Sequence, residues 1–194
     1  MNLLFLGPEK RPQIAIIDFL SNDGNSITRC EERLNDEGIA KYGYDFLISF
    51  SYRYIISKEI LNYFKDKAIN LHISYLPWNK GADPNLWSIL ENTPQGVTIH
   101  QMDYKLDAGK ILYQKEIFFD ENETLKSSYE KLQIDLVELF IAKWDNIKNN
   151  KAVPKNQRGI GSYHRSSDKS SYQELLTNGW DTKVKDLKGK AVND

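Results

Sequence analysis

The 194-residue sequence contains a single cysteine, Cys30, and no long apolar run. One cysteine excludes an internal disulfide and a cysteine-rich zinc site. The mean hydropathy is −0.57, and no run approaches the roughly 20 apolar residues that a membrane-spanning helix needs. The opening residues MNLLFLGPEKRP have no basic segment before their short apolar run, which predicts a first strand rather than a signal peptide. These features predict a cytoplasmic protein with no membrane partner.

An excess of charge of either sign is also missing, because the formal net charge is −1. A nucleic-acid-binding domain usually shows a strong basic bias, so no nucleic-acid partner is predicted. The charge is distributed unevenly, however, since residues 148–194 hold ten Lys or Arg against five Asp or Glu. Two interpretations stay open: a solvated tail that is basic by composition, or a basic wall that faces a phosphorylated ligand.

The glycine-rich dinucleotide-binding fingerprint is absent as well, because the first strand is followed by GPEKRP. The apolar residues that are present predict strands alternating with helices, and therefore an α/β fold with parallel strands in its first half. The expected strands are 2–6, 26–33, 45–50, 68–74, 97–102 and 111–119, and the expected helices are 13–20, 57–64, 85–90, 124–149 and 171–176. Residues 1–150 are predicted to form the core. The short irregular tail 151–194 is expected to pack on it, because it is too short for a second domain.

An amide and an imidazole lie two residues apart, at Asn70 and His72, on the expected fourth strand. In an extended chain this spacing places both side chains on one face. Such a pair suits the attack of an amine on an acyl carbon: Asn70 and a protonated His72 would stabilise the oxyanion. Alternatively, a neutral His72 would remove a proton from the amine. Asp107 is the candidate carboxylate that orients the imidazole and raises its pKa. The competing interpretation is a strand end where both side chains only bond local backbone.

An ordered series of short motifs runs from this strand onward. Its members are Asn70, His72 and Ser74, Leu76-Pro77, Lys80-Gly81, Pro84, Gly96-Val97-Thr98, and Leu106-Asp107-Ala108-Gly109. The series resembles the formyltransferase core shared by methionyl-tRNA formyltransferase, glycinamide ribonucleotide transformylase and the sugar N-formyltransferases. This resemblance implies a Rossmann-like formyltransferase core, a mostly parallel twisted sheet flanked by helices. It also implies formyl transfer from N10-formyltetrahydrofolate to a primary amine, with Asn70, His72 and Asp107 as the catalytic trio and no metal.

The same resemblance implies a folate pocket between two loops, one after the third strand and one before Asp107. The candidate residues are Ser51, Tyr52, Tyr54, Ile55 and Ile56 in the first loop, and Asp103, Tyr104 and Lys105 in the second. Ile55 and Ile56 either line a pteridine slot or belong to the core, and the sequence leaves this open. His100, in the position after Gly-Val-Thr-Ile, is expected to shape the site rather than to ionise in the reaction.

Features of the tail and of the first loop disfavour two of the three acceptors that the family uses. The tail is too short for the separate basic domain of the tRNA enzyme, and GPEKRP is poorer in glycine and serine than the phosphate loop of the purine enzyme. The tail resembles that of sugar N-formyltransferases, especially those acting on dTDP-4-amino-4,6-dideoxyglucose. The resemblance therefore implies a nucleotide-linked amino sugar for surface polysaccharide such as the O-antigen of lipopolysaccharide, and a homodimer. The alternatives are the two other formyltransferases or a non-catalytic folate- or nucleotide-binding module.

The tail is expected to close over the sugar nucleotide beside the loop that follows the fourth strand. Lys80 stands where the family usually has Arg, so it can meet a phosphate without forming the bidentate fork. Tyr163 and Trp180 are candidates to stack on the base. The full set of candidate substrate-binding residues is Trp78, Lys80, Gly81, Tyr163, His164, Arg165 and Trp180, with Arg158 as a further basic group. The alternative is a tail that packs along the long helix with Trp180 as its anchor, and with His164 in a polar surface loop.

Overall fold

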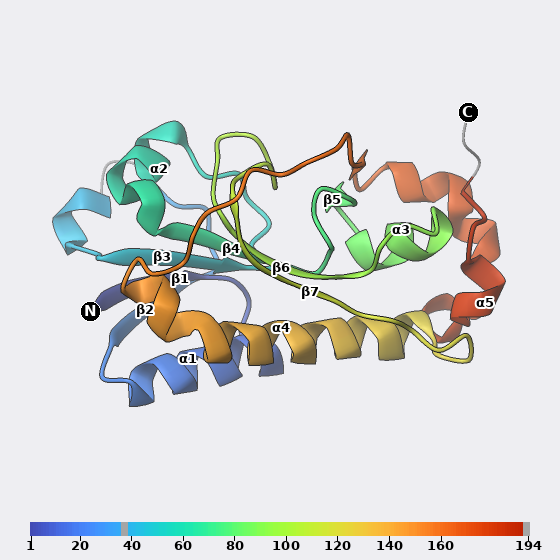
Figure 1. Cartoon of the computed structure of the whole chain (residues 1–194), viewed down its shortest axis with the longest axis horizontal. Coiled ribbons are helices and arrows are strands. Elements are labelled where there is room, and N and C mark those ends of the chain that lie inside the picture. Colours follow the sequence, from blue (N-terminus) through green and yellow to red (C-terminus); the bar gives the residue numbers. More distant parts are fainter. Residues whose placement is uncertain (36–38, 192–194) are drawn as a thin grey trace.

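The fold is built on a six-stranded sheet with the strand order β2-β1-β3-β4-β6-β7 (Figure 1). The structure is a computed structural model that describes residues 1–35 and 39–191. The first four of these strands pair in parallel, whereas β6 and β7 run antiparallel to their neighbours. The strands are β1 (Asn2–Leu6), β2 (Ser26–Cys30), β3 (Phe46–Phe50), β4 (Ala68–His72), β6 (Gly96–Gln101) and β7 (Ile111–Glu116). The predicted mostly parallel sheet flanked by helices is thus confirmed.

Helices cover both faces of the sheet. In Figure 1, α1 and α4 lie along one face and α2 lies on the other, while α3 and α5 sit at one end. The helices are α1 (Arg11–Asn22), α2 (Lys58–Phe64), α3 (Pro84–Leu90), α4 (Leu125–Lys148) and α5 (Val184–Leu187). Short 3-10 segments occur at Ile39–Tyr42, Lys65–Lys67, Asp168–Leu175 and Gly179–Asp181. Among the described residues, no helix combines the length and the apolar character needed to cross a bilayer.

The long helix α4 follows directly from its sequence. Thr124 and Ser127 form a capping box, in which each hydroxyl accepts a hydrogen bond from the other residue's backbone N–H. Apolar side chains then recur at steps of four on one face, and Leu136, Phe140 and Trp144 are at most 1% exposed. They pack against the sheet, and burying each such side chain contributes about 1.5–3 kcal/mol relative to leaving it in water.

Strand β4 lies where the sheet changes direction, parallel to β3 on one side and antiparallel to β6 on the other. Its Ile69 and Leu71 belong to the core beneath α1 and α4. Because side chains alternate along a strand, Asn70 and His72 point to the opposite face, as their spacing predicted. His100 on β6 is the register partner of Asn70 and therefore shares that face.

The tail after α4 runs back across the sheet on the face away from α1 and α4 (Figure 1). Lys155 forms a bridge with Ile111 at the edge strand β7. Farther along, β8 (Tyr163–His164) pairs in parallel with the short strand β5 (Lys80–Gly81). The expected helix at 171–176 is instead part of the 3-10 segment Asp168–Leu175.

Several expected strands are longer than the observed ones. The strand predicted at 68–74 ends at His72, because the chain then turns and the Ser74 hydroxyl donates to the carbonyl of Trp78. The strands predicted at 26–33 and 111–119 end at Cys30 and Glu116. Residues 192–194 of the predicted tail, and 36–38 of the connector before β3, lie outside the described residues.

Candidate active site

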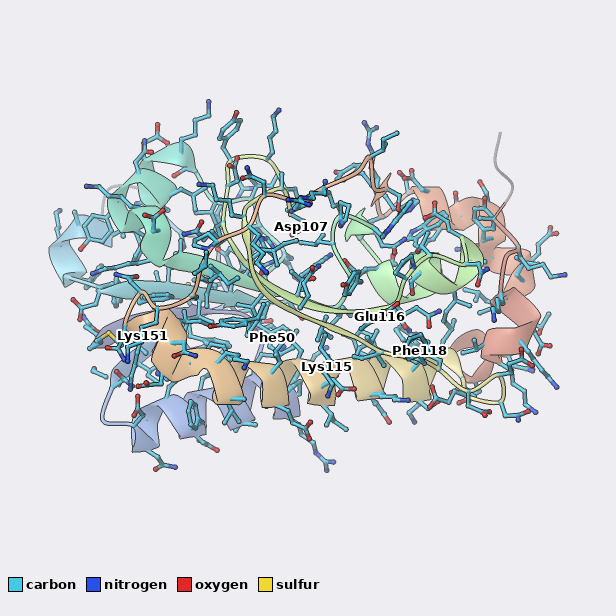
Figure 2. All side chains as sticks on the ribbon, viewed as in Figure 1. Phe50, Asp107, Lys115, Glu116, Phe118 and Lys151 are labelled. Carbon is cyan, nitrogen blue, oxygen red and sulfur yellow. The ribbon has the colours of Figure 1, made fainter. Side chains whose placement is uncertain are left out.

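Asp107 is the centre of the candidate site and is only 7% exposed. Its Oδ1 accepts a hydrogen bond of 3.2 Å from Asn70 Nδ2, and its Oδ2 accepts one of 2.9 Å from the backbone N–H of Gly81. Oδ2 also lies 3.7 Å from Nε2 of His72. Figure 2 shows Asp107 on the side of the sheet opposite α4, close to the tail. The structure thus brings Asn70, His72 and Asp107 together from one strand and a loop.

His100 completes this cluster. Its Nδ1 lies 2.8 Å from the carbonyl oxygen of Gln101, which can only accept, so Nδ1 carries a proton. When the ring is neutral, Nε2 is therefore an acceptor, and it lies 3.3 Å from Asn70 Nδ2. The Asn70 amide then donates one N–H to Asp107 and the other to His100. The register between β6 and β7 shifts between Ile99 and His100, directly beside this side chain.

The Asp107 carboxylate is held in its ionised form. Burial by itself would raise its pKa. The neighbouring imidazoles of His72 and His100 and the backbone N–H of Gly81 outweigh burial, and they hold the pKa well below the usual range of an aspartate. A fixed negative charge therefore lies within contact distance of both imidazoles.

The imidazole of His72 is neutral near pH 7. Burial lowers its pKa below 6.5, and this effect exceeds the opposite effect of the Asp107 charge. Asp107 raises the His72 pKa, as expected, but the ring is so deeply buried that burial outweighs this effect and the net shift of the pKa is downward. The carbonyl oxygen of Asn79 lies 3.1 Å from Nε2, so Nε2 carries the proton and Nδ1 carries the lone pair.

The first candidate folate loop follows β3. Ser51 adopts a left-handed backbone with φ of 59°, and the Tyr52 hydroxyl donates to the Glu32 carbonyl at 2.7 Å. The structure separates the two isoleucines that the sequence left open. Ile56 is buried in the apolar cluster beneath α2, whereas Ile55 is 81% exposed. Only Ile55 is available to a ligand. Tyr54 packs edge-on against Tyr52, with ring centroids 5.4 Å apart.

The second candidate folate loop lies between β6 and Asp107. Asp103 Oδ1 accepts from the backbone N–H of Lys105, and Tyr104 is 60% exposed. The Nζ of Lys58, at the start of α2, lies 5.1 Å from the centroid of the Tyr104 ring. Because Lys58 closely follows the first loop, this contact places the two candidate folate loops side by side.

The β5–β8 pairing brings together several candidate substrate residues. Lys80 is the register partner of Tyr163, which is half exposed, and Arg165 follows on the surface. Gly81 is the second residue of β5, and Trp78 lies just before that strand. Trp180 lies farther away, where it packs on Tyr129 of α4 and lines a cavity of about 280 Å³.

His164 differs from its prediction. It was expected in an exposed polar loop or against the nucleotide, but it is buried. Its ring stacks on Trp87 with a centroid separation of 3.8 Å and an interplanar angle of 6°, and its Nε2 lies 3.1 Å from Glu91 Oε1. The imidazole therefore packs against Trp87 inside the protein rather than in an exposed loop. Sequence periodicity could not reveal this contact, because it joins residues more than 70 positions apart.

A cavity of about 770 Å³ lies away from the trio, near the end of α4, and none of the predicted site residues lines it. Its walls include Tyr63 and Lys65 around the end of α2, Gln101 on β6 and Pro154 in the tail. The volume of this cavity therefore does not coincide with the cluster of polar and titratable side chains around Asp107.

Comparison with known proteins decides the family. The model of the formyl transferase family matches residues 6–142, a range that contains the whole trio. The chain belongs to the formyl transferase family. Methionyl-tRNA formyltransferase of Thermodesulfovibrio yellowstonii is 35% identical over 137 residues, which are 68% of this chain and 44% of that protein. This formyl transferase chain thus matches less than half the length of that curated relative.

Among solved structures, the formyltransferase PseJ from Anoxybacillus kamchatkensis is 47% identical, with a TM-score of 0.94. The match covers 99% of this chain and 100% of PseJ, which was solved with UDP-4,6-dideoxy-4-formamido-L-AltNAc and tetrahydrofolate. A 4-N formyltransferase from Francisella tularensis shares the fold at 24% identity and a TM-score of 0.75, over 90% of this chain and 79% of that one.

Proposed function

We propose that this protein transfers a formyl group from N10-formyltetrahydrofolate to the primary amine of a nucleotide-linked amino sugar. The observation that carries the proposal is the ionised Asp107 held between Asn70 and a neutral His72 in a formyl transferase chain. The full-length likeness to PseJ supports the acceptor class. It also makes a UDP-linked 4-amino-4,6-dideoxy sugar the first acceptor to test, ahead of dTDP-4-amino-4,6-dideoxyglucose. The product would be a formamido sugar for surface polysaccharide.

His72 is assigned as the general base. Its Nδ1 lone pair accepts the proton that the amine loses as the new C–N bond forms at the formyl carbon. The Asp107 carboxylate, 3.7 Å from the other ring nitrogen, then stabilises the imidazolium. Collapse breaks the bond between the formyl carbon and N10 of the folate, and His72 returns the proton to N10. Atoms and charge balance without any covalent intermediate on the protein.

Asn70 is assigned to the oxyanion. Both of its N–H groups are already engaged, by Asp107 at 3.2 Å and by His100 at 3.3 Å. A developing oxyanion would take over the N–H that now faces His100, because a neutral imidazole is the weaker of the two acceptors. The bond to Asp107 would keep the amide in its orientation, so that little reorganisation accompanies the reaction.

The folate is assigned to the space between the two candidate loops. The contact between Lys58 and Tyr104 supports this assignment because it brings the loops together. The exposed Ile55 supplies an apolar side chain, and Ser51, Tyr52 and Tyr54, with Asp103 and Lys105, supply the surrounding backbone and rings.

The sugar nucleotide is assigned to the mouth formed by β5 and β8. Lys80 and the exposed Arg165 are the cationic candidates for the pyrophosphate, and the half-exposed Tyr163 is the candidate to stack on the base. Trp78, just before β5, and Gly81, within β5, would contact the sugar. Trp180 beside Tyr129 is the second aromatic candidate for the base.

A panel of acceptors tests the proposal. Purified protein receives N10-formyltetrahydrofolate and, in separate reactions, UDP- or dTDP-linked amino sugars, glycinamide ribonucleotide or methionyl-tRNA. Tetrahydrofolate release and the mass of the product are measured, with Asp107→Asn as the inactive control. We expect a formamide product with an amino sugar nucleotide. Preferred formylation of glycinamide ribonucleotide or methionyl-tRNA, or tight binding without turnover, would replace the proposal with one of the alternatives.

A further inference from the structure

A buried network connects the tail to His72 through Asn79. The Asn79 carbonyl oxygen faces His72 Nε2 at 3.1 Å, and Asn79 itself is 0% exposed. Its backbone is left-handed, with φ of 55°, a conformation that Asn tolerates better than most residues but that still needs support. The direction of the Asn79 carbonyl therefore depends on what holds this residue.

The remaining polar groups of Asn79 are all bonded. The backbone N–H donates to Ser162 Oγ at 3.0 Å, and Nδ2 donates to Glu91 Oε2 at 3.1 Å. Oδ1 accepts from the Thr93 hydroxyl at 2.9 Å. These bonds come from the end of α3, the connection after it and the tail. They leave the carbonyl as the group of Asn79 that faces the catalytic cluster.

Glu91 sets the direction of the whole network. Its Oε2 also accepts from the Ser162 hydroxyl at 3.0 Å, and its Oε1 lies 3.1 Å from His164 Nε2. The single hydroxyl proton of Ser162 points to the carboxylate, so the oxygen of Ser162 is free to accept from the Asn79 backbone N–H. Three hydrogen bonds among Asn79, Ser162 and Glu91 therefore share one consistent direction, from amide and hydroxyl toward the carboxylate.

We propose that Glu91 and Ser162 are positioning residues that act through the carbonyl of Asn79 and, together with the Asp107 carboxylate 3.7 Å from the same nitrogen, fix the tautomer of His72. A neutral imidazole has two tautomers, and only the one protonated on Nε2 can donate to that carbonyl. Its Nδ1 then keeps the lone pair that the proposed base reaction uses. The other tautomer would direct a lone pair at the Asn79 carbonyl and place a proton on Nδ1. The tail thus takes part in the chemistry by orienting His72. The kinetic part of this inference rests on the proposed function, but the tautomer itself does not.

The experiment compares wild type with Glu91→Ala, Ser162→Ala and Glu91→Gln. Gln keeps an acceptor oxygen for Asn79 and Ser162, so Glu91→Gln is the conservative rescue. Glu174→Ala is the matched control, because Glu174 is an exposed acid on the tail that carries Ser162, and it lies outside the network. The chain has only three histidines, so two-bond ¹H–¹⁵N correlation of the ring nitrogens, at about pH 8 where imidazole is neutral, identifies each tautomer. The His72 signals are assigned with His72→Asn.

We expect His72 of wild type, Glu91→Gln and Glu174→Ala to carry its proton on Nε2. Glu91→Ala should show a mixture of tautomers, and Ser162→Ala a smaller admixture. With the acceptor that the panel identifies, kcat of Glu91→Ala should fall on the order of tenfold or more, because the wrong tautomer cannot act as the base. The KM for folate should stay unchanged.

The inference is overturned by folded Glu91→Ala and Ser162→Ala proteins in which His72 keeps the wild-type tautomer. If Glu91→Ala fails to fold, Ser162→Ala decides, since it removes a single hydroxyl. The ring measurement needs no substrate. Altered tautomers in a protein that formylates no amine would therefore support the positioning role and reject the proposed function.

Discussion

The side chains of the cluster around Asp107 are buried and hydrogen-bonded, whereas those of the candidate folate loops and of the mouth formed by β5 and β8 are largely exposed. In the cluster, Asn70, His72 and Asp107 bond to one another or to backbone, and Asp107 is 7% exposed. Tyr104 on the second folate loop is 60% exposed, and Tyr163 at the mouth is 52% exposed. A reacting group must be held in place before the substrate arrives, whereas a binding group can be ordered by the substrate itself. The comparison separates residues that should control kcat from those that should control KM.

The largest effect is expected inside the cluster. His72→Asn and Asp107→Asn should each lower kcat by on the order of a hundredfold or more, the scale of losing a proton-transfer group or an electrostatic partner. The KM values should change little, because neither residue is exposed at the mouth. Steady-state kinetics with both substrates measure this, with circular dichroism to verify folding. Near-normal turnover in folded His72→Asn would remove the trio from the mechanism.

Substitutions at Gly161 and Gly159 test whether the tail packs tightly against the loop that carries Pro77. Gly161 and Gly159 both have positive φ, so alanine should cost about 1 kcal/mol of folding free energy at either position. A Cβ on Gly161 would lie 2.1 Å from the carbonyl oxygen of Pro77, whereas one on Gly159 would meet nothing within 4 Å. Gly161→Ala should therefore lose a further ~1–3 kcal/mol and part of its kcat.

Chemical denaturation of the two glycine variants measures the difference, and Gly159→Ala serves as the control for backbone strain. Equal losses of unfolding free energy in both variants would mean that the tail does not pack tightly against the loop that carries Pro77.

Substitutions at the mouth should change the KM for the sugar nucleotide and leave kcat nearly unchanged. Lys80→Ala and Arg165→Ala should each raise the KM for the sugar nucleotide roughly tenfold, the scale of one hydrogen bond to a charged group. The KM for folate should stay constant, and Lys126→Ala, an exposed lysine on α4, is the control. An unchanged KM in both variants and in the double variant would reject the proposed pyrophosphate contact.

The smallest effect is the pH dependence of stability. Burial lowers the folded-state pKa of His72 below 6.5, so protons bind the unfolded chain more readily. The stabilising contribution is present above pH 6.5 and is lost as pH falls below that value. Asp107, whose pKa is also lowered in the fold, adds a second loss as pH falls below 3.8. Unfolding free energies of wild type and His72→Asn between about pH 7 and 5 should converge as pH falls. Parallel curves would contradict the lowered pKa.

The sequence predicts the parts of this site that follow from local pattern. The two-residue spacing of Asn70 and His72 implied a shared face, and the motif order placed Asp107 with them. It did not predict the sign of the His72 pKa shift. That sign depends on whether burial of the ring or the Asp107 charge has the larger effect, and both follow from the tertiary structure. The hydrogen bond between Asn79 and Ser162 could not be predicted from the sequence either, because it joins residues 83 positions apart that no periodicity links.

The central claim is that His72 acts as a neutral base, and the pH dependence of kcat/KM for the wild-type enzyme tests it most directly. This ratio reports ionisations in the free enzyme and in the free amine, so the acceptor is titrated separately and its own ionisation is divided out. A neutral His72 base gives activity that rises with pH and reaches its plateau with an enzyme midpoint below pH 6.5, since burial lowers the His72 pKa. Activity that instead falls as pH rises through this range would show that the reaction needs a protonated His72, and would contradict the account.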